Sequence, residues 1–401
     1  MYIQTQDDLR AFAQRAAHSS VLAIDTEFLR EKTYYATLCL IQLATDDEIV
    51  LVDPLRIASL DALAPLFTSP SIMKIFHAGR QDIELLYDHL GVIPAPLFDT
   101  QIAAALLGYS QQIGYGNLVS ALCGEKLKKS DAFTDWSLRP LSDSQLNYAR
   151  EDVLFLPDMY AQMHQKLEHR GRLNWLNEDF DELANLENYV IDPFTRYRHL
   201  AHGSSLNRKA LAAARELAAW RETEARARNL PRKWVLTDEQ IVEAARRNLY
   251  SIDELFMVRG IKRKITVPEA RELIARVQKV WKMDPSTWPE LERSSRHSEP
   301  NVDGIIDVLS SIVRLRAEEN NIAFQTLASH SDLVNLARGH FDLCRCMHGW
   351  RRSLIGLELL DALHGKISIS IHNNKVSLTL SLIHISEPTR LRQLSRMPSS
   401  A

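Results

Sequence analysis

The chain begins with short apolar runs rich in β-forming residues, set between amphipathic stretches. Runs at residues 21–24, 38–44 and 48–53 are separated by turn signals, which predicts three antiparallel strands joined as a meander. A further short run at residues 73–76 predicts a fourth strand before a turn. Helical periodicity is found at residues 6–17, 60–67, 81–90, 100–107, 118–123 and 142–166. This pattern predicts an α/β layered domain of about 200 residues.

From Asn207 onward the pattern is helical, as in the stretch LAAARELAAWRETEARAR. An internal repeat divides this part of the chain. A shift of 92 residues aligns residues 228–246 with residues 320–338 without a gap, and places Asn229 on Asn321. The repeat predicts two copies of one small helical module. We therefore expect a first domain at residues 1–203, a basic helical module at 204–296 and a second helical module at 297–379.

Residues 380–401 read LSLIHISEPTRLRQLSRMPSSA. Both ends of this stretch are what the two ends of a sequencing adapter encode when they are translated in frame. We expect this tail to have no fold of its own, and the natural chain to continue differently after about Thr379.

The composition is that of an ordinary globular protein. Of the 401 residues, 45% are hydrophobic and 25% are charged, which excludes collagen-like and wholly disordered chains. The N-terminus has no apolar leader, and no apolar stretch approaches 18 residues, so we expect neither a signal peptide nor a membrane span. Four scattered cysteines do not make a disulfide framework, so we expect reduced thiols and a cytoplasmic location.

The net charge of −3 conceals an uneven distribution along the chain. Residues 1–203 hold 17 Lys and Arg against 28 Asp and Glu, whereas residues 204–296 hold 20 against 13. The pattern indicates that the first segment holds cations and that the middle segment meets a polyanion. A solvated helix face explains the basic block equally well on charge alone.

Three acidic motifs carry the candidate chemistry. Asp25 and Glu27 directly follow an apolar run, and residues two apart on a strand point to one face. Asp82 follows the turn at residues 77–79 and is expected in the first turn of a helix. Tyr148 and Asp152 are four residues apart in a predicted helix and share a face. Taken singly, each motif is also explained as a strand-end cap, a helix-start acid or a local hydrogen bond.

Taken together, the motifs D-x-E, H-A-G-x-x-D and Y-x-x-x-D resemble the three exonuclease motifs of the DEDD superfamily in its tyrosine branch. The stretches DTEFLREKTYYATLCLIQLA, IFHAGRQDIELL and QLNYAREDV are similar to ribonuclease D, and the helical modules resemble the HRDC domains of that family. The resemblance implies an RNase H-like α/β exonuclease domain with a mixed sheet flanked by helices, followed by two small all-α modules, of which the second is degenerate.

The resemblance also implies the roles of the acids. Asp25, Glu27 and Asp152 would hold the ion that activates water, with Asp25 bridging to a second ion supported by Asp82, and Tyr148 would orient the attacking water. Phosphodiester hydrolysis builds negative charge that two divalent ions can stabilise. Oxygen ligands suit Mg²⁺ or Mn²⁺, whereas the sequence lacks the His and Cys clusters typical of zinc.

The sequence also contains candidate residues for contacts with RNA. An unpaired terminal base can stack on aromatic groups, and basic side chains can hold phosphates. Each of these residues also has a purely structural explanation. The candidates are Phe28, Tyr35, His77 and Trp136 in the first domain, and Arg228, Arg232, Lys233, Arg246 and Arg247 in the basic module.

The resulting prediction is a metal-dependent 3′–5′ exoribonuclease that releases nucleoside 5′-monophosphates. By resemblance, its substrates are tRNA precursors and other RNAs with a single-stranded 3′ end, and no membrane or obligate protein partner is expected. A 3′–5′ DNA exonuclease is the alternative enzyme, and a catalytically inactive nucleic-acid-binding protein is the alternative of another class. Retention of all four acids and Tyr148 argues against the inactive protein.

Overall fold

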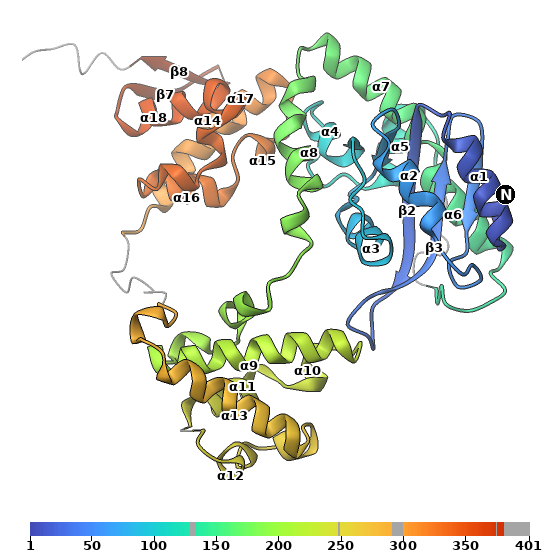
Figure 1. Ribbon diagram of the computed structural model, residues 1–401. Helices are drawn as coiled ribbons and strands as arrows, with labels where there is room; N and C mark the ends of the chain where they lie inside the picture. Colours follow the sequence, from blue (N-terminus) through green and yellow to red (C-terminus); the bar gives the residue numbers. More distant parts are fainter. Residues whose placement is uncertain (128–133, 248, 291–299, 374, 381–401) are drawn as a thin grey trace, which may run out of the picture. The chain divides into compact units, whose positions relative to one another are not determined.

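The computed structural model describes the chain except residues 128–133, 248, 291–299, 374 and 381–401 (Figure 1). The chain divides into two compact units. The first comprises Met1–Ala103 and Gly114–Arg296, and the second comprises Ala104–Ile113 and the segment from His297 onward. The four segments expected from the sequence stay a prediction, and most of the adapter-like tail lies outside the described residues.

A six-stranded mixed sheet forms the centre of the first unit, with the order β1-β4-β3-β2-β5-β6. The neighbours β2, β3 and β4 are antiparallel, which confirms the predicted meander. β5 is parallel to β2, and β6 is parallel to β5. The strands are β1 (Tyr2–Ile3), β2 (Val21–Leu29), β3 (Thr37–Ala44), β4 (Ile49–Val52), β5 (Met73–Phe76) and β6 (Leu97–Asp99).

Helices cover both faces of this sheet because its central strands carry apolar side chains on both faces. One face packs into a core that includes Leu22 and Ile24 of β2 together with Phe12 of α1 and Ile83 of α3. The helices of this part are α1 (Gln6–Ala16), α2 (Ala64–Thr68), α3 (Arg80–Leu90), α4 (Thr100–Ala105), α5 (Tyr115–Cys123), α6 (Asp143–Leu154), α7 (Leu156–His169) and α8 (Asn177–Ala184).

The single helix expected at residues 142–166 is two helices in the structure. α6 begins with a capping box at Ser142, and it ends at Leu154. α7 starts at Leu156 with a proline in its first turn. Pro157 has no backbone N–H to donate to the carbonyl four residues earlier, that of Val153 in the last turn of α6, so the interruption of the helix at Phe155 has a local cause.

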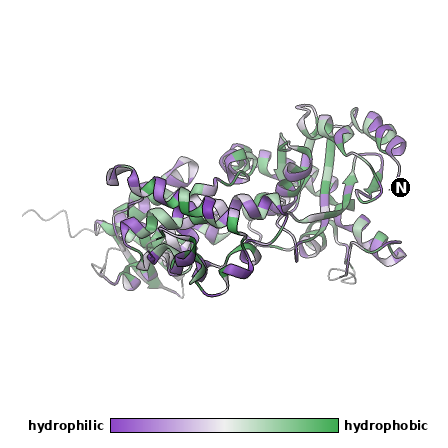
Figure 2. Cartoon of the chain, turned by 60° about the horizontal axis from the view of Figure 1, so that its bottom comes forward, coloured by the Kyte–Doolittle hydropathy of each residue, from purple (hydrophilic) through white to green (hydrophobic). Residues whose placement is uncertain are grey.

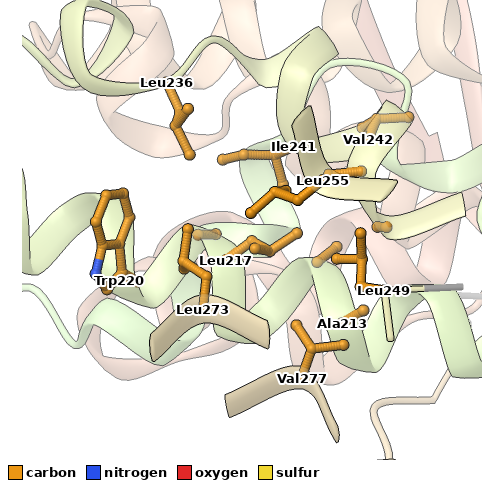
Figure 3. Packing of buried hydrophobic residues seen from close by; sticks show 14 of the residues in the cluster. Ala213, Leu217, Trp220, Leu236, Ile241, Val242, Leu249, Leu255, Leu273 and Val277 are labelled. Atoms are coloured by element: carbon orange, nitrogen blue, oxygen red, sulfur yellow. The ribbon is translucent and has the colours of Figure 1, made fainter. Parts of the chain in front are cut away.

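A helical module follows the sheet within the first unit. It consists of α9 (Arg208–Ala227), α10 (Arg232–Val235), α11 (Asp238–Arg246), α12 (Ile252–Phe256) and α13 (Val267–Lys282). Leu217 and Trp220 of α9 pack against Ile241 of α11 and against Leu273 and Val277 of α13 (Figure 3). The longer helices α9, α11 and α13 each contribute several apolar residues to this core. Hydrophilic and hydrophobic positions alternate along the helices of the chain (Figure 2).

The second unit contains α14 (Asp303–Asn320), α15 (Phe324–Leu327), α16 (His330–Ala337), α17 (Gly349–Arg351), α18 (Leu357–Leu363) and the hairpin of β7 (Ile367–His372) and β8 (Lys375–Leu380). The internal repeat of the sequence corresponds to helices that start at the same spacing in the structure. α10 and α15 start 92 residues apart, as do α11 and α16. The aligned residues Asn229 and Asn321 both have a positive φ, of 49° and 50°.

No helix among the described residues is long and apolar enough to cross a membrane, in agreement with the sequence.

A buried ion pair fixes the segment that leads into α6. Arg139 Nε lies 2.6 Å from Asp53 Oδ2, and the two side chains are 9% and 0% exposed. The same guanidinium donates to the carbonyl oxygens of Cys39 and Trp136, at 2.6 and 2.7 Å. Asp53 also accepts from the Tyr2 hydroxyl at 2.5 Å. The network ties the segment before α6 to β1, β3 and β4.

Replacing Arg139 by alanine is expected to lower the free energy of unfolding by about 3–5 kcal/mol, because Asp53 is left buried without its counter-ion. Urea denaturation at pH 7 measures the loss. The matched control is Arg15→Ala, which removes the half-exposed pair of Arg15 with Glu48 and is expected to cost much less, because solvent screens such a pair. Equal losses for the two variants would contradict the assignment of Arg139 as a buried anchor.

Candidate active site

Strand β2 positions the first two acids of the site. Leu22 and Ile24 enter the core on one face of the sheet, so the alternation of the strand places Asp25 and Glu27 on the other face. A register irregularity follows directly between Glu27 and Phe28. Such bulges bend a strand and redirect its side chains, and they are frequent beside active sites.

Helix α6 brings the third acid to the same face. Its capping box at Ser142 fixes where the helix begins, and thereby the face on which Tyr148 and Asp152 project. One carboxylate oxygen from each of Asp25, Glu27 and Asp152 lies within 4.8 Å of the other two. All three residues are partly exposed. The structure therefore brings together three of the four acids that the motifs singled out.

The fourth acid, Asp82, stands beside this group on α3. Its Oδ1 accepts a hydrogen bond of 2.5 Å from the Thr26 hydroxyl, and the residue is 8% exposed. The turn before α3 is held by Asp99, which accepts from the backbone N–H groups of Ala78 and Gly79 at 3.2 and 2.8 Å. Only glycine fits at position 79, because a Cβ there would lie 2.5 Å from the Phe76 side chain.

Burial raises the pKa of every acid in the group, and the charges of the other acids of the group add to this for Asp25 and Glu27. Burial, and then the charges of Asp152 and Asp82, raise the pKa of Glu27 to about 8. Burial raises the pKa of Asp152 to about 7 and that of Asp82 to about 6. The pKa of Asp25 is raised well above 3.8 by burial and then by the charges of the other three carboxylates. Carboxylates this close cannot all ionise unless a cation joins them.

Tyr148 lies one helical turn before Asp152 and packs near Trp136. The centroids of the two rings are 6.1 Å apart. Trp136 is 2% exposed and belongs to a core cluster with Cys39, Leu40 and other residues. This burial favours the packing role that the sequence left open for Trp136 over base stacking. The indole therefore supports the Tyr148 ring.

The other aromatic candidates differ in their surroundings, and Tyr35 meets the Tyr34 ring and donates its backbone N–H to Asn229 Oδ1 at 3.0 Å. His77 Nδ1 is 2.9 Å from Thr100 Oγ1, and its ring meets that of Tyr115 edge to face at 5.6 Å. Phe28 is partly buried beside Glu27, and Tyr35 is 37% exposed. Their contact with RNA stays a prediction.

Sequence reasoning missed two residues that act on the acids. Thr26 stands between Asp25 and Glu27 in the motif, but it faces the other way and holds Asp82. The Tyr115 hydroxyl donates to the Glu151 carbonyl at 2.7 Å and accepts from the Phe155 N–H at 3.3 Å, which fixes the end of α6. A hydroxyl residue directly after an acid is a sequence feature from which Thr26 could have been predicted, whereas no local sequence feature identifies Tyr115.

The basic residues of the helical module differ in how far their charge is already neutralised. Arg228 pairs with Glu224 and Glu269, and Arg247 pairs with Glu243. Arg232 lies 3.5 Å from the buried Glu222. Lys233 is exposed. These pairs leave less of the charge for a polyanion than the sequence count suggests.

Arg246 has a different setting. Its guanidinium donates to the Ser205 hydroxyl at 2.5 Å, and it lines a cavity of about 330 Å³ together with Lys209, Arg247 and Trp281. Lys209 Nζ lies 4.5 Å from the centre of the Trp281 ring. Three cations and no acid line the cavity. Arg247 is paired with Glu243, whereas no ion pair of Lys209 or Arg246 is found among the described residues. This cavity is the part of the module best suited to a phosphate.

The metal-free protein is expected to lose stability as the pH rises. Glu27 binds its proton more tightly in the folded chain than in the unfolded chain, where its pKa is about 4.5, so the free energy of unfolding falls between about pH 4.5 and 8. Glu27→Gln should flatten this decline and raise stability at pH 8. Thermal denaturation in EDTA measures both, with the exposed Glu168→Gln as control. A decline that is equally steep in Glu27→Gln would contradict the raised pKa.

Comparisons with known proteins agree with this geometry. Residues 1–168 match the 3′–5′ exonuclease family model, and residues 210–277 match the HRDC domain model. Ribonuclease D of Jannaschia sp. is 38% identical over 94% of this chain and 98% of its own, and ribonuclease D of Acidiphilium cryptum is 36% identical over 94% and 96%.

Among solved structures, Escherichia coli RNase D, described as an exoribonuclease involved in structured RNA processing, superposes with a TM-score of 0.74. It is 30% identical, and the match covers 91% of this chain and 98% of that one. The DEDD exonucleases depend on divalent metal ions, and the acidic group of β2 and α6 is the corresponding feature here. The chain therefore belongs to the ribonuclease D family of 3′–5′ exoribonucleases.

Proposed function

We propose that this chain removes nucleotides one at a time from the 3′ end of RNA, with two divalent ions held by Asp25, Glu27, Asp82 and Asp152. The observation that carries the proposal is the trio of carboxylate oxygens within 4.8 Å of one another. The charges acting most strongly on Asp25 and Glu27 are those of other carboxylates. An arrangement of this kind is stable in its ionised form only with cations between the acids.

The donor set fits Mg²⁺ or Mn²⁺. Asp25, Glu27 and Asp152 offer hard carboxylate oxygens only, and neither His nor Cys belongs to the group. Asp82 accepts from the Thr26 hydroxyl through Oδ1, which holds its carboxylate beside the other three acids, where it would support a second ion. When bound, such ions make water a stronger nucleophile and stabilise the negative charge that develops on the phosphate.

The side chains of this enzyme then have separate tasks. The four acids fix the reacting phosphate and water by holding the ions. Tyr148 orients the attacking water through its hydroxyl, because it shares a helix face with Asp152. The buried pair of Arg139 and Asp53 holds the segment with Trp136, and the indole in turn backs the Tyr148 ring. Positioning of this kind contributes to rate without bond formation by the protein.

The proposed substrates are tRNA precursors and other RNAs with a single-stranded 3′ end. The terminal nucleotide enters the group of acids, with Phe28, His77 and Tyr35 as candidate contacts. Phosphates upstream of the end bind the basic module, chiefly at the cavity of Lys209, Arg246 and Arg247. Binding of this type depends on salt and is largely independent of sequence.

Purified protein incubated with a 3′-labelled RNA and its DNA counterpart tests the proposal. We expect the label to appear at once as a nucleoside 5′-monophosphate from RNA with Mg²⁺ or Mn²⁺, and not with chelator. Asp25→Asn serves as the inactive control, and unchanged circular dichroism shows that it folds. Nucleotide release in the presence of chelator would overturn the metal assignment, as would at least a tenth of wild-type activity in Asp25→Asn. A preference for DNA over RNA would overturn the proposed substrate class.

Tyr148→Phe is expected to slow the chemical step about 10²-fold, the lower end for positioning and acid–base groups, because the ions supply most of the activation. Metal affinity should stay unchanged, because Asp152 keeps its place on α6. Single-turnover cleavage at saturating Mg²⁺ and a metal titration measure the two quantities. If Tyr148→Phe kept the wild-type single-turnover rate, Tyr148 would be a packing residue. If additional Mg²⁺ restored the rate of the variant, Tyr148 would be a support for Asp152.

Lys209→Gln combined with Arg246→Gln is expected to weaken binding of tRNA-sized RNA and to reduce the slope of log affinity against log salt. Each phosphate of a single strand that the protein no longer neutralises reduces the slope by roughly 0.7, so the pair should reduce it by about 1.4. Filter binding between 50 and 200 mM salt is the measurement. The control Arg10→Gln removes an exposed cation on α1 and should leave the slope unchanged. An unaltered slope in the double variant would show that the cavity binds no phosphate.

A further inference from the structure

Gln42 on β3 is a buried polar side chain without partners. The residue is 0% exposed, and neither its amide nitrogen nor its amide oxygen has a hydrogen-bond partner among the described residues. Buried polar groups are nearly always hydrogen-bonded, so an unpaired carboxamide calls for an explanation.

Another buried polar residue of the sheet shows the usual solution. Lys74 on β5 is also 0% exposed, but its Nζ donates to the carbonyl oxygens of Ser69, Ile72 and Ala95 at 2.8, 2.6 and 2.5 Å. The fold thus satisfies Lys74 completely through its own backbone. Gln42 lies in the same sheet and is left without such hydrogen bonds.

The register of the sheet places Gln42 directly beside the group of acids. It stands opposite Asp25 of β2 and opposite Leu51 of β4. Directly opposed residues project from the same face, with Cβ atoms roughly 4.5–5.5 Å apart. Leu51 packs with Trp136 and with Ala149 of α6, so this is the face that α6 covers. The Gln42 and Asp25 side chains therefore leave the sheet next to each other on this face.

We infer that Gln42 is a positioning residue of the metal centre, whose carboxamide donates to the Asp25 carboxylate and holds it in its metal-binding orientation. The register that sets Gln42 opposite Asp25 and the unpaired amide of Gln42 together support this hydrogen bond. A hydrogen bond to a metal-binding carboxylate is of the stronger, charge-assisted kind. Groups that orient metal ligands in this way typically contribute 10–100-fold to metal affinity. The inference rests on the metal centre of the proposed function.

Calorimetric titration of the full chain with Mn²⁺ tests the inference without an activity assay. Gln42→Leu is expected to raise the Mn²⁺ dissociation constant about 10–100-fold. Its melting temperature in EDTA should not fall, because an unpaired polar group is replaced by an apolar one of similar size. Gln42→Met, which keeps the length of the side chain, is the second variant and should behave alike. Ile41→Leu, whose side chain lies in the core of the opposite face, is the control and should keep the wild-type affinity.

Each contrary result leads to a different conclusion. Unchanged Mn²⁺ affinity in the Gln42 variants would overturn the inference, as would failure of both variants to fold in EDTA, since either shows a merely structural residue. An equal loss in Ile41→Leu would overturn it as well, because any change in β3 would then disturb the site. If the wild-type protein bound no Mn²⁺, the proposed function itself would fail. If the wild-type protein binds Mn²⁺ and the Gln42 variants bind it with the same affinity, only the inference about Gln42 fails.

Discussion

The close approach of several carboxylates that are partly removed from water is the constraint on which the site depends. Asp25, Glu27 and Asp152 are held within 4.8 Å of one another by a strand and a helix. Holding them there costs folding free energy, as the raised pKa values of these groups and of Asp82 show. That cost is relieved by cations, so the same geometry that destabilises the metal-free protein creates affinity for divalent ions.

The rest of the first domain can be understood as the support for this arrangement. The mixed sheet fixes Asp25 and Glu27 on one face and gives the opposite face to a core with α1 and α3. The Arg139–Asp53 pair joins the segment before α6 to the sheet, and Tyr115 holds the end of α6. Rigid elements carry the reacting groups on both sides, as a site that needs sub-ångström positioning requires.

The sequence predicted those features that depend on local spacing. A period of two placed Asp25 and Glu27 on one face, and a spacing of four placed Tyr148 with Asp152. The 92-residue repeat predicted the matching pairs α10 with α15 and α11 with α16. These inferences needed only the geometry of one strand, one helix or one repeat.

Features that depend on the pairing of residues far apart in the sequence could not be predicted in this way. The short strands β1 and β6 exist only through their neighbours, and the partners Asp53 and Arg139 are 86 positions apart. Gln42 looked like any polar residue of a strand, and its relation to Asp25 appears only from the register.

Proton release on metal binding tests the central claim most directly. Titration of the wild-type protein with Mn²⁺ at pH 7, in buffers that differ in ionisation enthalpy, reports protons expelled from the site. We expect net proton release, because Glu27, with a pKa of about 8, holds a proton at this pH and must lose it to bind ions. Asp25→Asn should diminish both the binding and the release. Mn²⁺ binding without proton release, or with equal release from Asp25→Asn, would contradict the account.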